Sequence, residues 1–143
     1  MRVAQKRIDQ EKIRKLRELF ARNPKVIVAY FFGSQVRGEI TPLSDIDIAV
    51  LVKESLSLDE KADLIGEIIS SLETDNIDFV VLNHVSSVSL KFEVINGKVL
   101  YSANEGKRVD FETKVMGEYL LYGPMIDFYN SYFFREVREK YGG

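Results

Sequence analysis

The stretch KVIVAYFF, residues 25–32, constrains the fold more than any other part of this chain. Its residues are almost all β-branched or aromatic, whereas a strand with one solvent-exposed face alternates apolar and polar side chains. The pattern is therefore typical of a strand that is buried on both faces. Other segments of the domain have to supply the elements that cover it.

Helical and extended patterns alternate along the rest of the chain. Apolar residues at helical spacing predict helices over residues 5–21, 57–72 and 85–95. Further extended runs predict strands over residues 45–52, 76–82 and 98–102, the last of them a short edge strand. The start of the second helix, Ser57-Leu58-Asp59-Glu60, is close to a capping box. This order predicts an α+β fold, a small mixed β-sheet with helices packed on one or both faces.

The C-terminal tail has an unusual composition, because residues 101–143 hold ten of the sixteen Phe and Tyr residues. Gly123-Pro124 predicts a division into two helices, since proline suits the first helical position. The aromatic residues either complete the core or mark a surface for a partner. No linker or repeat is visible, so we expect one domain over residues 1–143, with a core over about 10–102 and a helical extension over about 107–141.

Composition narrows the classes of function. The 143 residues are the size of one ordinary domain, and the net charge of −2 gives no global basic field to attract nucleic acid. The apolar runs are shorter than the ~18 residues of a membrane span, and the first residues lack the apolar middle of a signal peptide. The chain has no cysteine, which fits a reducing compartment. We therefore expect a cytoplasmic protein that binds a small ligand or a protein, with no membrane and no direct nucleic acid binding.

Two acids, Asp45 and Asp47, interrupt the otherwise apolar strand over residues 45–52. Side chains two residues apart on a strand share a face, so both carboxylates project together while Ile46 and Ile48 can fill the core. Two adjacent carboxylates repel each other, and with no Lys or His cluster nearby the natural neutraliser is Mg²⁺. The alternative is that one Asp caps a turn and the other is exposed at a sheet edge, which an isolated Asp-x-Asp would favour.

Gly33-Ser34 directly follows the buried strand and precedes residues 35–39, which can begin a helical turn. Glycine lets the backbone approach a ligand closely, and free N–H groups at a helix start bind phosphate oxygens. Alone, the pair would indicate a simple turn. Together with the Asp pair on the next strand, it describes a site for a nucleoside triphosphate with Mg²⁺.

The stretch GSQVRGEITPLSDID, residues 33–47, resembles the signature of the minimal nucleotidyltransferases of the DNA polymerase beta superfamily, which is Gly-Ser, a spacer and Asp-x-Asp. The resemblance covers roughly residues 10–102, and the tail resembles the extra helices of MntA-like antitoxins. It implies two Mg²⁺ ions, ATP as donor, and transfer of AMP to a tyrosine of a partner HEPN ribonuclease toxin, which silences that toxin.

The signature assigns a role to each of its residues. Asp45 and Asp47 would bridge both metal ions, and Ser34 with the Gly33 backbone would hold the terminal phosphates. Arg37 either adds positive charge near the leaving pyrophosphate or pairs with Glu39 on the surface.

Superfamily sites place a third acid on a strand beside the Asp-x-Asp strand, and two residues are candidates. Asp75 precedes the strand NIDFVVL, where Asp commonly serves a turn, whereas Asp78 lies inside it. We predict Asp78, because burying an unpaired carboxylate is costly. The alternative is that Asp78 lies on a solvated strand face or pairs with a Lys.

Two other functions remain open at this point. One is a nucleotidyltransferase that acts on a small molecule, such as an aminoglycoside. The other is a non-catalytic nucleotide-binding protein that neutralises a partner by contact.

Overall fold

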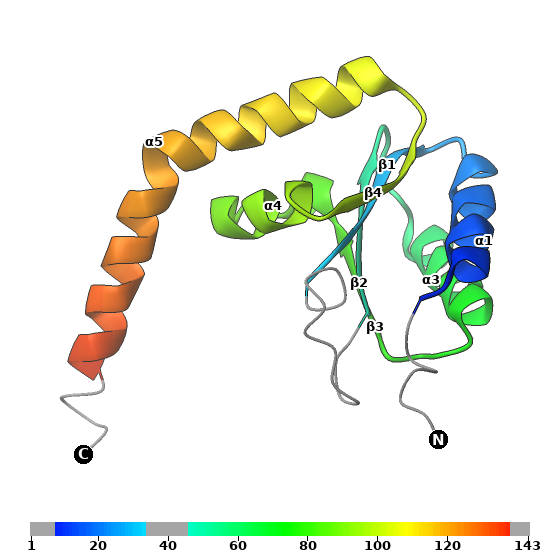
Figure 1. The fold of residues 1–143 in the computed structure, drawn as a ribbon, viewed down its shortest axis with the longest axis horizontal. Coiled ribbons are helices and arrows are strands. Elements are labelled where there is room, and N and C mark those ends of the chain that lie inside the picture. Colours follow the sequence, from blue (N-terminus) through cyan, green and yellow to red (C-terminus); the bar gives the residue numbers. More distant parts are fainter. Residues whose placement is uncertain (1–7, 34–45, 138–143) are drawn as a thin grey trace.

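The computed structural model describes residues 8–33 and 46–137, and its centre is a four-stranded sheet with helices on both faces (Figure 1). The strands lie in the order β3-β2-β1-β4. They are β1 (Val26–Phe32), β2 (Ile46–Val52), β3 (Ile77–Val81) and β4 (Lys98–Ser102). β1 pairs antiparallel with β2 and with β4, whereas β2 and β3 are parallel. The prediction of a mixed sheet with residues 98–102 at an edge is confirmed.

Helices α1 (Gln10–Ala21) and α3 (Leu58–Leu72) cover one face of the sheet. Their apolar sides meet the side chains of β2 that point toward them, among them Ile48 and Val50, and form one core cluster. The capping box of α3 is present, because the Ser57 side chain accepts from the Glu60 N–H and the Glu60 side chain accepts from the Ser57 N–H. The connection through α3 is what allows β3 to run parallel to β2.

The first helix begins later than the predicted residue 5. Asp9 is its N-cap, and the Asp9 carboxylate accepts a hydrogen bond from the Lys12 N–H at 2.9 Å. An N-cap residue has extended backbone and satisfies a free N–H group of the first turn, so it fixes the start of the helix at Gln10.

The opposite face of the sheet carries α4 (Val88–Ile95) and the first part of α5 (Glu105–Val137). Val28, Tyr30 and Phe32 of β1 form a second core cluster there. All seven residues of β1 are buried, which confirms that this strand is covered on both faces. The helix predicted from residue 85 begins at Val88, because a short 3-10 helix (Leu82–His84) follows β3 and Ser87 provides the N-cap.

The prediction of two C-terminal helices is wrong, because α5 is one helix with Pro124 inside it. An interior proline removes one backbone hydrogen bond and its ring crowds the preceding turn, so it bends a helix and need not end it. Figure 1 shows α5 changing direction partway along its length. None of the helices within the described residues is long and apolar enough to cross a membrane.

Candidate active site

Two acids from different segments meet where β2 begins. Asp47 of β2 and Asp78 of β3 are directly paired across the parallel strands, whose spacing in a sheet is about 4.8 Å. Strand alternation puts Asp47 on the same face as Ala49, and Asp78 on the same face as Val80, which is the face that α4 covers. The two carboxylates therefore lie side by side on one face, at the end of the sheet.

Gly33 lies against Asp47, one member of this pair. It follows the last residue of β1, Phe32, which is the cross-strand partner of Asp47. Gly33 has a φ of 84°, in the left-handed region, and a Cβ added there would lie 2.1 Å from Asp47 Oδ2. Only glycine fits both the conformation and the close approach. At the end of β1, the backbone of Gly33, which has no side chain, therefore lies directly against the Asp47 carboxylate.

Three of the predicted site residues, Ser34, Arg37 and Asp45, lie outside the described residues. Within residues 8–33 and 46–137, no three His, Cys, Asp or Glu side chains form a set that could hold a metal ion. The described part of the chain therefore places two of the three expected carboxylates together.

Asp78 is exposed on the edge strand β3, so burial does not force it to find a partner. The alternative of a solvated strand face describes its surroundings. Its position opposite half-buried Asp47 is what distinguishes it from Asp75, which is also exposed but precedes β3.

Gly97 lies in the turn between α4 and β4. A Cβ at Gly97 would lie 2.4 Å from the Phe31 carbonyl oxygen and 2.9 Å from Phe32 Cβ. The turn between α4 and β4 therefore packs directly on the last two residues of β1. Asn-Gly is a typical turn sequence, but no local pattern indicates which segment such a turn will touch.

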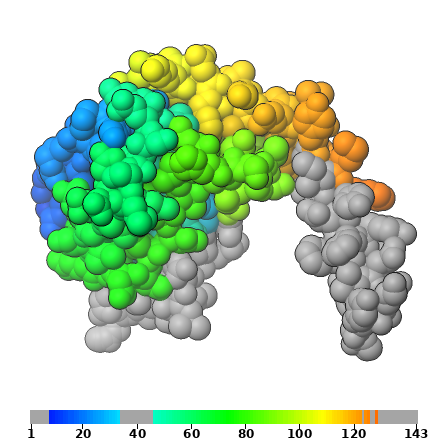
Figure 2. Space-filling model, turned by 180° about the vertical axis from the view of Figure 1, so that it is seen from behind, coloured from blue at the N-terminus to red at the C-terminus, as the bar shows by residue number. Residues whose placement is uncertain are grey.

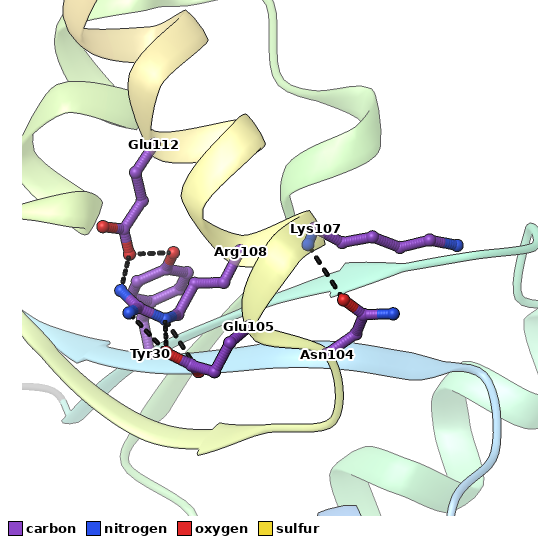
Figure 3. Close-up of polar contacts among 6 residues, drawn as sticks. All are labelled: Tyr30, Asn104, Glu105, Lys107, Arg108 and Glu112. Carbon is purple, nitrogen blue, oxygen red and sulfur yellow. Dashed lines mark hydrogen bonds and ion pairs between the residues drawn. The ribbon is translucent and has the colours of Figure 1, made fainter.

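A polar network ties α5 to the strand that leads to Gly33 (Figure 3). The hydroxyl of the fully buried Tyr30 donates to Glu112 Oε2 at 2.7 Å, and Arg108 Nη1 donates to the same oxygen at 3.0 Å. Burial, with this hydrogen bond to Glu112, raises the pKa of the Tyr30 phenol above its usual value. Arg108 also donates to Glu105, which lowers the pKa of that carboxyl to about 2. The network holds the first turns of α5 against β1.

Comparison with known proteins finds relatives of this chain among nucleotide-transferring enzymes. The family model described as "Polymerase beta, Nucleotidyltransferase" matches residues 14–106. The protein adenylyltransferase MntA of Shewanella oneidensis is 33% identical over 96 residues, which are 67% of this chain and 68% of the relative. The protein adenylyltransferase MntA of Aphanizomenon flos-aquae is 33% identical over 118 residues, covering 73% of this chain and 78% of the relative.

Solved structures give the same fold over most of the chain. A crystal structure of a toxin–antitoxin with AMP-PNP matches with a TM-score of 0.67 and 27% identity, covering 85% of this chain and 98% of that one. A structure of a tri-AMPylated Shewanella oneidensis HEPN toxin in complex with MNT antitoxin matches with a TM-score of 0.65 and 26% identity, covering 87% of this chain and 98% of that one.

Proposed function

This chain belongs to the polymerase beta nucleotidyltransferase family, and from that premise we propose that it is an antitoxin that transfers AMP from ATP to a tyrosine of a partner HEPN toxin. The names of its relatives support the reaction, since both curated relatives are protein adenylyltransferases. The similar structures with AMP-PNP and with an AMPylated HEPN toxin support the donor and the class of acceptor.

The observation that carries the proposal is the pairing of Asp47 with Asp78 beside the Gly33 turn. A nucleotidyltransferase needs carboxylates beside the α-phosphate that reacts. It also needs backbone N–H groups that can approach the triphosphate closely. Gly33, Asp47 and Asp78 lie at the ends of three different strands, so it is the pairing of these strands in the sheet that brings them together.

The two carboxylates fit Mg²⁺, which prefers oxygen ligands and keeps open positions for substrate phosphates. Asp47 and Asp78 would hold it, with Asp45 completing the set. When bound, the metal would neutralise charge on the triphosphate and lower the pKa of the acceptor hydroxyl.

The chemistry is a displacement at the α-phosphorus of ATP. The tyrosine oxygen of the partner forms a bond to that phosphorus, the bond to the bridging oxygen of the β-phosphate breaks, and pyrophosphate leaves with the electron pair. The phenol proton passes to the Asp78 carboxylate, whose exposure lets it release the proton to water. Ser34 and the Gly33 backbone hold the terminal phosphates, and Arg37 adds positive charge near the leaving group.

The test compares two aspartates that lie three residues apart. The purified protein is incubated with its HEPN partner, ATP and Mg²⁺, and AMP addition is followed by the intact mass of the partner. Asp78→Asn should lower the rate by about 10²–10⁴, the usual contribution of a positioned acid or base. Asp75→Asn, at an acid that is also exposed but lies outside the pairing, should leave the rate nearly unchanged.

The opposite pattern, a silent Asp78→Asn and a slow Asp75→Asn, would show that the acid has been assigned wrongly. A wild-type protein that binds the partner but adds no AMP would contradict the transfer reaction. That result would support neutralisation by contact, which the exposed apolar side chains of α5 favour as a second candidate.

A further inference from the structure

The outer edge of β3 has no partner strand within the described residues. β3 is the first strand in the order β3-β2-β1-β4, so it pairs with β2 on one side only. In Figure 2 the yellow-to-orange atoms of α5 lie along the top of the molecule, away from the green atoms of the segment that contains β3. The described part of α5, the other candidate surface for a partner, therefore does not cover this strand.

Alternate backbone groups of β3 point away from the sheet. The Asn76 carbonyl oxygen accepts from the Ile46 N–H at 3.0 Å, so the Asn76 backbone faces β2. N–H and C=O groups alternate between the two sides of a strand, and those of Asp78 therefore face β2 as well. The N–H and C=O groups of Ile77 and Phe79 point outward, where they can pair with another extended segment.

The sequence of β3 does little to protect this edge. Edge strands are commonly shielded by lysine, by proline or by a bulge. β3, with the sequence IDFVV, contains neither lysine nor proline, and its pairing with β2 is regular. Ile77, Phe79 and Val80 are only half-buried. An added strand would cover these apolar side chains further while it pairs with the outward backbone groups.

Asp78 determines which kind of segment this edge fits. An antiparallel segment places one residue directly opposite Asp78, with the Cα atoms about 4.5 Å apart, because the Asp78 backbone groups face β2 and do not bond across that pair. The two opposite side chains share a face, which is also the face of Asp47. A hydroxyl at the opposite position can donate to the Asp78 carboxylate, whereas a second copy of β3 would bring another carboxylate to the same edge.

We propose that the outer edge of β3 binds the acceptor segment of the partner as an added antiparallel strand, with the acceptor tyrosine opposite Asp78. The proposal rests on the proposed function, since it concerns the acceptor in that reaction. The residues before and after the tyrosine lie opposite Ile77 and Phe79, on the face that α1 and α3 cover. The recognised segment therefore carries an apolar residue on each side of the tyrosine, and backbone pairing supplies the rest of the affinity.

A proline at the first residue of β3 tests the backbone pairing. Ile77→Pro removes the outward N–H of that residue but no hydrogen bond to β2, and proline is tolerated at the first residue of an edge strand. Ile77→Ala is the matched control, because it also removes the apolar side chain but keeps the N–H. Thermal denaturation and calorimetry with ATP and Mg²⁺ check that both variants fold and bind the donor as the wild type does.

The rate of AMP addition to the HEPN partner is measured by intact mass at saturating ATP over a range of partner concentrations. Ile77→Pro should lower kcat/KM for the partner on the order of tenfold relative to Ile77→Ala, as expected for the loss of a hydrogen bond. ATP binding should be the same in both variants. Equal kcat/KM values in Ile77→Pro and Ile77→Ala would overturn the added strand.

Hydrogen exchange on the wild type keeps the proposal testable if Ile77→Pro fails to fold. Partner binding should slow exchange of the Ile77 and Phe79 amides by about tenfold or more, because both become paired. Unchanged exchange at these two amides would overturn the proposal.

The remaining outcomes separate this proposal from its alternatives. A wild-type dimer that Ile77→Pro converts to a monomer, with no change in AMP transfer, would assign the edge to a second copy of the chain and overturn the acceptor site. A wild type that adds no AMP to the partner contradicts the proposed function itself, whereas equal rates in the two Ile77 variants leave the transfer reaction standing.

Discussion

Gly33 has a left-handed backbone conformation, and the Asp47 carboxylate oxygen Oδ2 occupies the space that a side chain at Gly33 would need. Gly33→Ala should destabilise the fold by about 1–2 kcal/mol through the backbone alone. It should also push Asp47 from its place, and AMP transfer should fall on the order of 100-fold, because a displacement near 1 Å can cost that much. Thermal denaturation and the transfer rate measure the two effects.

Gly66→Ala is the control for this substitution, since a Cβ at Gly66 meets no atom within 4 Å. It should raise stability by about 0.5–1 kcal/mol, as expected of Gly to Ala in a helix, and leave the transfer rate unchanged. Wild-type activity in Gly33→Ala would mean that the contact with Asp47 has no role in the reaction.

The residue scale also shows what the sequence could predict. The period of a strand is a local rule, so the face shared by Asp47 and Ala49 followed from spacing alone. The exposure of Asp78 did not, because it depends on β3 lying at the edge of the sheet. The contact of Gly97 with Phe32 is tertiary, and no local pattern encodes which backbone a turn will approach.

At the scale of elements, α5 is anchored to β1 by the hydrogen bond between Tyr30 and Glu112. Tyr30→Phe should lower the free energy of unfolding at pH 7 by about 1.5–3 kcal/mol, the range for a hydrogen bond to a charged group. Tyr122→Phe, at an exposed tyrosine of the same helix, should change it by less than about 0.5 kcal/mol. Denaturant unfolding measures both.

The difference between the wild type and Tyr30→Phe should depend on pH. The pKa of Tyr30 is raised in the folded protein, so the unfolded chain loses this proton first as the pH rises. The stabilisation is fully present below about pH 10, the ordinary pKa of tyrosine, and declines above it. A difference that grows above pH 10 would contradict the buried, neutral phenol.

The elements themselves were largely predictable, and α5 was the main exception. Strong periodicity and the capping box at Ser57 fixed α3, and the apolar run fixed β1. Gly123-Pro124 carries a strong local signal for a break, but helical conformation continues through it with Pro124 exposed. Gly and Pro make it energetically costly to continue a helix, but the favourable interactions of the other helical residues can outweigh that cost.

At the scale of the whole molecule, the exposed apolar side chains of α5 bear on partner binding. Leu121, Tyr122, Met125 and Phe128 are all exposed, although single exposed apolar residues are normal. If they dock the partner, deletion of residues 124–143 should leave a folded protein that binds ATP but no longer co-purifies with the HEPN toxin. Thermal denaturation, calorimetry and pull-down measure the three properties.

Point variants keep this prediction testable if the truncated chain fails to fold. Phe128→Asp should weaken partner binding, because interface cores depend on aromatic anchors. Leu58→Asp is the matched control, since Leu58 is also an exposed apolar residue, at the start of α3. If both substitutions weaken partner binding equally, or if neither weakens it, α5 has no special part in docking.

ATP binding should depend strongly on Mg²⁺. The chain carries a net charge of −2, and its candidate site pairs Asp47 with Asp78, so an anionic triphosphate meets like charge. Calorimetry should give at least about tenfold weaker ATP binding in EDTA than in Mg²⁺. Equal affinity in the two conditions would remove the metal role from the aspartates.

The parallel pairing of β2 with β3 also determines when the candidate site forms during folding. Asp47 and Asp78 meet only after the chain has passed through all of α3 and returned to the sheet. Such nonlocal parallel contacts form slowly compared with helices and hairpins. An ATP site built on Asp47 and Asp78 would therefore form late in folding, and ATP that binds only the completed sheet would stabilise the folded protein by mass action.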